Sequence, residues 1–151
     1  RAMGEYGVQP HELELEITES VLMTDTDSTQ RIVGRLHELQ LPLAVDDFGT
    51  GYSSLAYLKH LRPSKLKIDR SFVRDIEDDP EDRVMVQAIV GLAHALGIRV
   101  VAEGVETEGQ REFLCDVGCE MLQGFLISRP QPAAEARRFL SRARRVEAVP
   151  A

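Results

Sequence analysis

Short apolar runs recur along the chain, each followed by a polar or glycine-rich turn and then by a helical pattern. Residues 13–17 alternate strictly between apolar and polar side chains, as a half-buried strand does. Residues 98–102 are almost continuously apolar, which is typical of a strand buried on both faces. The predicted strands are 13–17, 43–47, 66–69, 98–102 and a run through Met121, Leu122 and Phe125.

Helical patterns separate these strands. One helix is predicted around residues 32–39 and a short one near 55–61. The helix before Gly97 is marked at its start by Asp79 and Pro80 and at its end by that glycine. Two more are predicted, from a capping box of Thr107 and Gln110 to about Gly118, and from about 132 to 145 with Ala136, Phe139 and Leu140 facing inward.

The order of the elements predicts the fold class. Strands that alternate with helices at roughly 20–35-residue spacing indicate successive βα units. Such units form a parallel sheet with right-handed crossovers. The pattern alone leaves two architectures open, a doubly wound open sheet and a (β/α)₈ barrel.

Polar side chains stand at the carboxyl end of every predicted strand. In a parallel barrel these ends converge on one face, where catalytic groups are found. Any one of these residues alone is equally well explained as a helix cap or a solvated turn residue, but all five strand ends together favour a common site. The residues are Glu16, Asp46 with Asp47, Lys67 with Asp69, Glu103 and Gln123.

The composition of this rim indicates a reaction. Glu16, Asp46, Asp47 and Glu103 supply hard oxygen ligands, which suit Mg²⁺ or Mn²⁺ better than zinc. Without cations, these carboxylates would repel one another. Lys67 adds a point charge for a phosphate or a metal-bound water. Two such metals are a standard device for in-line attack on a phosphodiester, so the residues suggest metal-assisted phosphoryl chemistry.

Charge and cysteine content exclude several other classes. The formal net charge is −7 and the pI about 5.1, which argues against a general DNA, RNA or anionic-membrane binder. Divalent cations still allow an anionic ligand. Cys115 and Cys119 are too few for a disulfide scaffold or a four-ligand zinc site, so we expect free thiols in a reducing compartment. No apolar run approaches the length of a membrane span, and we expect a cytoplasmic location.

The loop at residues 49–54 also suggests a different site. It follows a strand and begins G-x-G, as a dinucleotide-binding fingerprint does. However, Ser54 stands where the third glycine belongs, and Asp46 and Asp47 would face the pyrophosphate. These residues disfavour a nucleotide cofactor.

Five ordered segments resemble the motifs of the EAL domain family, over most of residues 13–130. The family comprises bacterial phosphodiesterases that hydrolyse cyclic di-GMP to linear pGpG on a modified (β/α)₈ barrel. The resemblance therefore implies an α/β fold, an incomplete TIM-type barrel of about five C-terminal βα units. The segments are LEITES at 15–20, DDFGTGYSSL at 46–55, LKIDRSFV at 66–73, VVAEGVET at 100–107 and QGFLISRP at 123–130, of which DDFGTGYSSL is the most specific.

The resemblance assigns roles residue by residue. It implies that Glu16, Asp46, Asp47 and Glu103 are ligands of two Mg²⁺ or Mn²⁺ ions, and that Glu103, Asp47 and Lys67 act on the attacking water. Glu19 matches the glutamate that steadies the DDFGTGYSS loop. The remaining candidates, for substrate binding or for the loops around it, are Gln123, Asp69, Glu106 and Pro130.

The chain also departs from the family pattern. It has no Glu-Ala-Leu motif and no asparagine, so two expected metal ligands are missing, and Phe125 stands where tyrosine is common. We therefore expect residues 1–151 to be the C-terminal portion of a single EAL domain, inactive alone although its parent hydrolyses cyclic di-GMP. Unpaired strand edges predict a homodimer or pairing with the missing barrel strands. A non-catalytic cyclic di-GMP receptor and a structural interaction module remain as alternatives.

Overall fold

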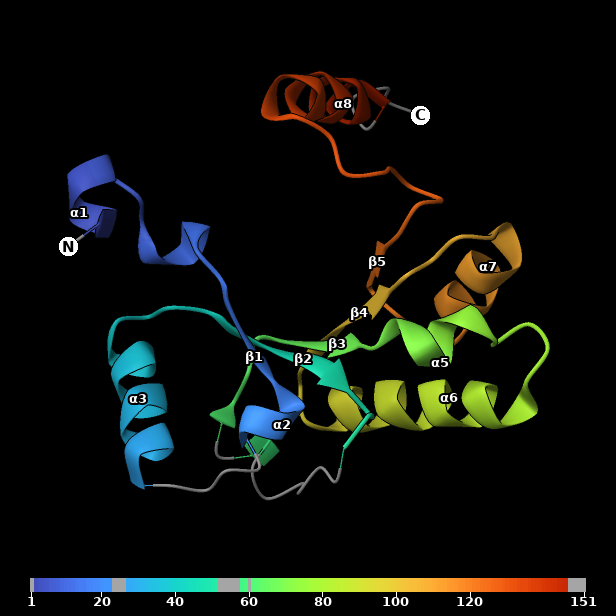
Figure 1. Cartoon of the computed structure of the whole chain (residues 1–151), viewed down its shortest axis with the longest axis horizontal. Helices are drawn as coiled ribbons and strands as arrows, with labels where there is room; N and C mark the ends of the chain where they lie inside the picture. The colour runs from blue at the N-terminus through green and yellow to red at the C-terminus, as the bar shows by residue number, and fades with distance from the viewer. Residues whose placement is uncertain (1, 23–26, 52–57, 60, 147–151) are drawn as a thin grey trace.

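The computed structural model describes the whole chain except residues 1, 23–26, 52–57, 60 and 147–151. Its centre is a parallel sheet of five strands in the order β1-β2-β3-β4-β5 (Figure 1). This order is the consecutive one of a (β/α)₈ barrel, as predicted, and five strands make only part of such a barrel. The strands are β1 (Leu15–Thr18), β2 (Leu43–Phe48), β3 (Lys65–Ile68), β4 (Arg99–Glu103) and β5 (Met121–Gln123).

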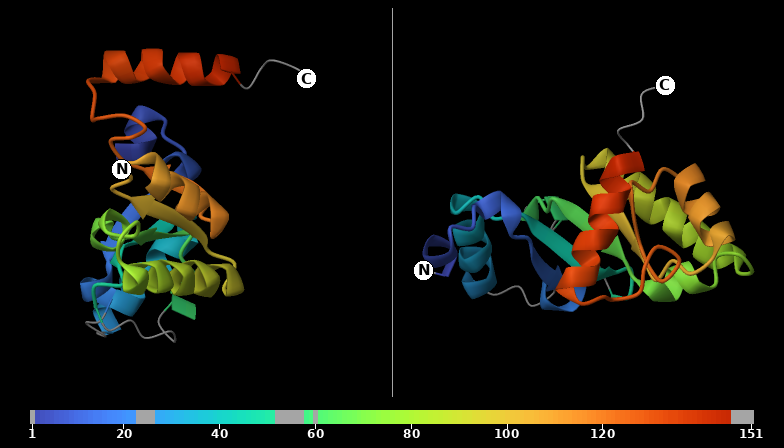
Figure 2. Two further views of the ribbon diagram at one scale, coloured as in Figure 1. Left: turned by 90° about the vertical axis from the view of Figure 1, so that its right-hand side faces the viewer. Right: turned by 90° about the horizontal axis from the view of Figure 1, so that it is seen from above.

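Helices connect the strands and cover one face of the sheet. In Figures 1 and 2 the long helix α6 and helix α3 lie on one side of the sheet, and α8 lies on the other side. The predicted short helix near 55–61 falls mostly outside the described residues. The helices are α1 (Ala2–Tyr6), the 3₁₀ turn η1 (Pro10–Glu12), α2 (Glu19–Leu22), α3 (Asp27–Glu38), α5 (Arg70–Arg74), α6 (Pro80–Ala95), α7 (Glu108–Asp116) and α8 (Ala133–Val146).

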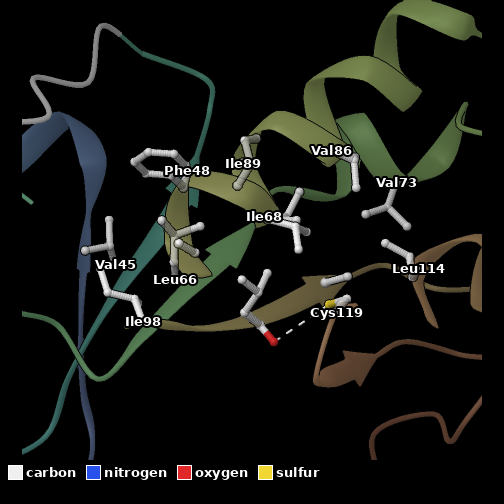
Figure 3. Close-up of a cluster of buried hydrophobic side chains, with 14 of the residues drawn as sticks. Val45, Phe48, Leu66, Ile68, Val73, Val86, Ile89, Ile98, Leu114 and Cys119 are labelled. Carbon is white, nitrogen blue, oxygen red and sulfur yellow. Dashed lines mark hydrogen bonds between the residues drawn. The ribbon is translucent and has the colours of Figure 1, made fainter. Parts of the chain in front are cut away.

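The hydrophobic core lies between the sheet and its helices (Figure 3). Alternate strand positions supply it, because successive side chains of a strand point to opposite faces. Val45 pairs in register with Leu66, and Leu66 with Val100, so these apolar side chains form a continuous row across the sheet. Helices α5, α6 and α7 add Val73, Val86, Ile89 and Leu114 to the same cluster.

Local signals in the sequence set the helix ends. Asp79 caps α6 by accepting a hydrogen bond of 2.8 Å from the Glu81 amide, and Gly97 follows that helix with a φ of +71°. The capping box of Thr107 and Gln110 begins α7, as predicted. Helix α5, which the sequence analysis did not predict, begins at its N-cap Asp69. Its single turn is too short to produce a clear periodic signal.

Two predictions about the C-terminal part are wrong. Phe125 lies beyond β5 rather than in it, half-exposed, with the Arg129 guanidinium 4.4 Å above its ring. Helix α8 stands apart from the sheet at the end of an extended segment (Figures 1 and 2). Phe139 and Leu140, expected on its inner face, are 41% and 60% exposed, so the described part of the chain leaves this face of the helix largely uncovered.

Both cysteines are free, as predicted. Burial raises the pKa of the Cys119 thiol to about 11, and its Sγ donates to the carbonyl oxygens of Val100 and Met121. Cys119 is therefore a protonated core residue. Among the described residues, no helix combines the length and the apolar character needed to span a membrane.

The row of buried strand residues should dominate stability. Leu66 is fully buried at the middle of the sheet, so Leu66→Ala should lower the free energy of unfolding by about 2–5 kcal/mol. Val84→Ala, at a position on α6 that is 63% exposed, is the control and should change it by less than about 0.5 kcal/mol. Urea unfolding measures both, and equal effects would contradict the assigned core.

Candidate active site

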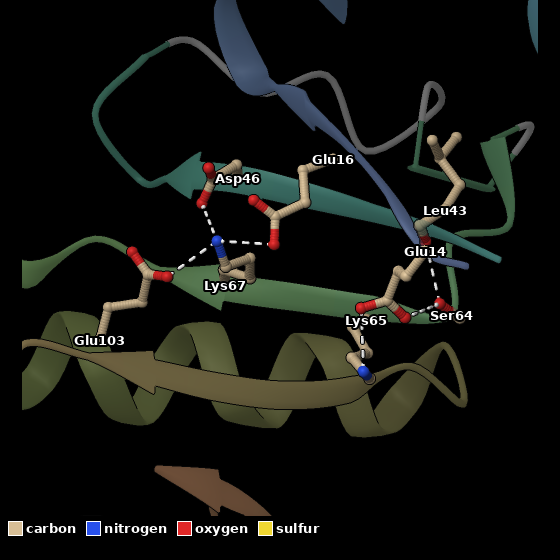
Figure 4. Close-up of polar contacts among 8 residues, drawn as sticks. All are labelled: Glu14, Glu16, Leu43, Asp46, Ser64, Lys65, Lys67 and Glu103. Atoms are coloured by element: carbon tan, nitrogen blue, oxygen red, sulfur yellow. Dashed lines mark hydrogen bonds and ion pairs between the residues drawn. The ribbon is translucent and has the colours of Figure 1, made fainter. Parts of the chain in front are cut away.

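The ammonium group of Lys67 lies among three carboxylates that come from three other strands (Figure 4). Its Nζ is 2.8 Å from Glu103 Oε1, 2.9 Å from Asp46 Oδ1 and 3.0 Å from Glu16 Oε1. The Lys67 side chain is only 9% exposed. We call these four residues the Lys67 cluster.

The sheet register brings the cluster together. Glu16, Asp46, Lys67 and Glu103 lie one each on β1, β2, β3 and β4. Glu103 ends β4, Asp46 and Lys67 lie in the second half of their strands, and Glu16 is the second residue of β1. Their neighbours along each strand point into the helix-covered core, so these four point to the opposite face. The predicted convergence of strand-end residues is therefore observed for these four side chains.

Charge determines the state of Lys67. Burial alone would lower its pKa, since a buried ammonium group loses its hydration. The adjacent carboxylates of Glu103, Asp46 and Glu16 outweigh this effect, so the pKa of Lys67 is raised above its ordinary value. The side chain is consequently a cation at neutral pH, and it offsets the mutual repulsion of the three carboxylates.

Asp46 contacts Lys67 through a buried oxygen. Its Oδ1 has no donor in hydrogen-bond geometry within the part of the chain that the structure describes, but it is paired with the Lys67 ammonium group at 2.9 Å. All the acidic groups of the cluster are carboxylates, and such oxygen-only ligands fit a hard divalent metal. As the described side chains lie, no three His, Cys, Asp or Glu residues are close enough to hold an ion among them.

The backbone at Asp47 departs from a regular strand. The β2–β3 pairing shifts register between Val45 and Phe48, and Asp47 has a φ of +53°. Non-glycine residues at such angles are uncommon and concentrate at functional positions. Thr50 holds the turn, because its Oγ1 donates a hydrogen bond of 2.8 Å to the Asp47 carbonyl oxygen. The Asp47 carboxylate makes no contact with Lys67 among the described interactions.

Glu19 holds the loop that follows β2. It is 2% exposed, and its Oε2 accepts hydrogen bonds from the amides of Gly49 at 2.9 Å and Gly51 at 3.2 Å. A Cβ on Gly51 would lie 3.3 Å from this carboxylate, so the loop backbone packs closely on Glu19 at this position. The rest of the DDFGTGYSS loop, from residue 52 onward, lies outside the described residues.

The other candidates lie around the cluster rather than in it. Gln123 pairs with Glu103 in the β4–β5 register and is exposed. Asp69 caps α5: hydrogen bonds from Ser71 outweigh its partial burial and keep the pKa of this carboxyl below its ordinary value. Glu106 and Pro130 are exposed, on the loop after β4 and on the segment before α8.

A second ion pair, not predicted from the sequence, lies on the same face of the sheet. Lys65 Nζ lies 2.9 Å from Glu14 Oε1 at the amino ends of the strands, and Ser64 Oγ donates to the same carboxylate (Figure 4). The alternation of residues 13–17 was the available signal, because it places Glu14 on the same face as Glu16. This pair lies at the opposite end of the sheet from the Lys67 cluster.

Known proteins are similar to this chain in sequence. A family model described as EAL domain matches residues 1–130. The bifunctional diguanylate cyclase/cyclic di-GMP phosphodiesterase MucR of Pseudomonas aeruginosa is 48% identical over 134 residues, which is 89% of this chain and 20% of that protein. The cyclic di-GMP phosphodiesterase NbdA of the same organism is 49% identical over 149 residues, 99% of this chain and 19% of that protein.

Solved structures share the fold. The MucR phosphodiesterase in complex with c-di-GMP superposes with a TM-score of 0.86 at 48% identity, over 89% of this chain and 55% of that one. A manganese/cy-diGMP complex of Klebsiella pneumoniae BlrP1 gives 0.80 at 39% identity, over 85% of this chain and 33% of that one. The chain thus spans about half of the solved MucR domain and about a fifth of the curated relatives. On the family match and these likenesses, the chain belongs to the EAL domain family.

Proposed function

We propose that this chain carries the C-terminal portion of a single EAL domain whose activity is the hydrolysis of cyclic di-GMP to linear pGpG. The observation that carries the proposal is the Lys67 cluster, in which three carboxylates and a cation meet at the carboxyl ends of parallel strands. The phosphodiesterase names of MucR and NbdA support it. The cytoplasm remains the expected location.

Divalent metal belongs to the same proposal. Glu16, Asp46, Asp47 and Glu103 would hold Mg²⁺ or Mn²⁺, and their oxygen-only chemistry supports this assignment. BlrP1 structures described as manganese and calcium complexes with cy-diGMP lend further support. Bound there, divalent ions supply positive charge that neutralises phosphate oxygens and makes a water molecule more acidic.

In this proposal, Glu103 and Lys67 have different roles toward the attacking water. Glu103, with one oxygen on Lys67 and a side chain 19% exposed, is placed to accept or orient a proton of that water. Lys67 stays charged and holds an anionic oxygen against phosphorus by its positive charge. Asp47, directly after Asp46, has a left-handed backbone conformation, and this conformation changes the direction of the chain near the end of β2.

The surrounding residues have supporting roles in this proposal. Glu19 keeps the loop after β2 in place through the amides of Gly49 and Gly51. Gln123 presents an amide beside Glu103 for the substrate. For Asp69, Glu106 and Pro130 we propose positioning of the loops that border the substrate.

Two alternatives to a phosphodiesterase differ from it in what they do with cyclic di-GMP. A non-catalytic cyclic di-GMP receptor would bind the ligand without cleaving it, and a structural interaction module would do neither. Retention of all four carboxylates and Lys67 favours hydrolysis by the complete domain. The absence of Glu-Ala-Leu and of asparagine leads us to propose that the 151-residue chain is inactive by itself.

The outer strands of the sheet lead us to expect that the chain pairs with further strands. The outer edges of β1 and β5 are the ends of the sheet order, and unpaired edges invite pairing. We expect the isolated chain to self-associate, either as a homodimer or as larger species, at tens of micromolar. Analytical ultracentrifugation that finds a clean monomer there would contradict this expectation.

Glu103 should be required for turnover but not for ligand binding. In a longer protein that includes the preceding barrel strands, Glu103→Gln should lower kcat for cyclic di-GMP by about 100-fold or more. The matched control is Glu14→Gln, which removes a charge from the same face of the sheet at its other end. Production of pGpG with Mn²⁺ and ligand affinity by calorimetry measure the two effects.

The outcomes separate the alternatives. Turnover in Glu103→Gln equal to that of the unmodified protein would defeat the role assigned to Glu103. If the unmodified protein binds cyclic di-GMP without hydrolysing it, the receptor alternative is favoured. If it neither binds nor hydrolyses cyclic di-GMP, the interaction module is favoured. Hydrolysis by the 151-residue chain alone would contradict its proposed inactivity.

Lys67 should also stabilise the fold. Lys67→Met leaves three neighbouring carboxylates without their cation, so we expect a loss of roughly 1–3 kcal/mol in the free energy of unfolding. The folded-state pKa of Lys67 is raised, so its contribution is fully present below the ordinary lysine pKa and is lost only as pH rises through the raised value. Urea unfolding should therefore give the same difference between the two proteins at about pH 7 and pH 9. A difference that shrinks by half over this range would show that Lys67 is not held as an ammonium ion.

A further inference from the structure

The loop directly after Glu103 is held at every residue from 104 to 107. A Cβ on Gly104, whose φ is +73°, would lie 2.6 Å from the Arg70 Cβ, so the backbone packs directly on the start of α5. Val105 is fully buried, and its amide donates a hydrogen bond of 3.1 Å to the carbonyl oxygen of Gln123. Its carbonyl oxygen accepts one of 3.0 Å from Leu126.

Gln110 completes this arrangement from inside the protein. It is one of three buried polar or charged side chains among the described residues, at 4% exposure. Its Oε1 accepts hydrogen bonds from the amides of Glu106 at 2.7 Å and Thr107 at 3.1 Å. Its Nε2 donates one of 3.1 Å to the carbonyl oxygen of Arg74, at the end of α5.

A capping box alone does not need all these bonds. A Gln at this position of a capping box requires only the bond to the N-cap amide, here that of Thr107. The bonds to Glu106 and Arg74 connect elements outside α7. Helix α5 follows β3, which carries Lys67, and the loop follows β4, which carries Glu103. One side chain therefore ties together the two segments that leave the Lys67–Glu103 ion pair.

A second contact joins the same segments. Thr107 Oγ1 donates to Glu77, which lies between α5 and α6. Glu77 packs against the start of α7 so closely that a Cβ on Gly109 would lie 2.0 Å from its Oε1. The connection between the end of α5 and the start of α7 thus has both a buried and an exposed contact.

We propose that Gln110 is a positioning residue that sets the distance between Glu103 and Lys67. An amide is required because the position needs an acceptor for two backbone amides and a donor for one carbonyl oxygen at the same time. Glutamate keeps the acceptor and loses the donor, and leucine loses both. The expected effect of Gln110 on hydrolysis rests on the function proposed above. Its effect on the distance between Glu103 and Lys67 does not.

The test reads the ion pair directly, without hydrolysis. The sequence contains three lysines, Lys59, Lys65 and Lys67, so ¹⁵N-lysine labelling of the full chain yields few ammonium signals in NMR spectra. Lys67→Arg assigns the Lys67 signal, and Lys65, paired with Glu14, serves as the internal reference. The spectra are compared for Gln110→Leu, Gln110→Glu and the unmodified chain.

A matched control separates positioning from general loss of stability. Ile98→Ala truncates a core side chain that is 5% exposed, just before β4 and at the end of that strand away from Glu103. It should lower Tm and leave the Lys67 ammonium signal and the amide exchange of Glu106 and Thr107 unchanged. Gln110→Leu should move or broaden the Lys67 signal, leave that of Lys65 in place, and speed exchange of both amides about tenfold.

Gln110→Glu keeps the proposal testable if the leucine variant does not fold. It should preserve slow exchange at Glu106 and Thr107, since the acceptor remains, and still shift the Lys67 signal because the bond to Arg74 is lost. An unchanged Lys67 signal in a folded Gln110 variant would overturn the proposal. In a hydrolysing protein, either variant should lower kcat about tenfold with little change in KM. Absence of hydrolysis in every protein, with the NMR result as expected, would instead count only against the proposed function.

Discussion

The site depends on one electrostatic constraint: three carboxylates can share one face of the sheet only if a cation lies among them. Lys67 supplies that cation within 3.0 Å of Glu16, Asp46 and Glu103. Its burial would favour the neutral amine, and the carboxylates reverse that preference. Four strands are linked by these contacts at their carboxyl ends. The pairing of Lys67 with three carboxylates therefore holds four strands together, and the same charged groups suit the site to phosphate chemistry.

The two faces of the sheet carry different kinds of side chains, apolar on one face and charged on the other. The helix-covered face carries the apolar row through Val45, Leu66 and Val100, which provides cohesion. The opposite face carries charged pairs at both ends, Glu14 with Lys65 and the Lys67 cluster. Because strand side chains alternate in direction, Asp46, Lys67 and Glu103 each directly follow a buried apolar residue that anchors them. The neighbours of Glu16 are apolar and partly buried. Rigid strands rather than loops therefore position the four charged groups.

The loops around the strand ends add precision. Glu19 fixes the turn after β2 by accepting from two glycine amides, and Asp69 fixes the start of α5. Gln110 joins the end of α5 to the loop after β4 from a buried position. These are polar side chains that bond to backbone groups rather than to a substrate, and together they restrain the segments that leave Asp46, Lys67 and Glu103.

Local patterns predict the approximate positions of the five strands, the helix caps at Asp79 and Thr107, and the candidate residues after each strand, because alternation, capping and turn signals act over a few residues. Which of these side chains meet depends on the folded arrangement. The register gathers Glu16, Asp46, Lys67 and Glu103, while Asp69 turns to its own helix. The folded arrangement also determines that Phe139 and Leu140 stay exposed and that Gln110 reaches Arg74, 36 positions earlier. A helical face does not specify its neighbour, and a capping motif does not show what else its side chain can reach, since both depend on contacts between residues far apart in the chain.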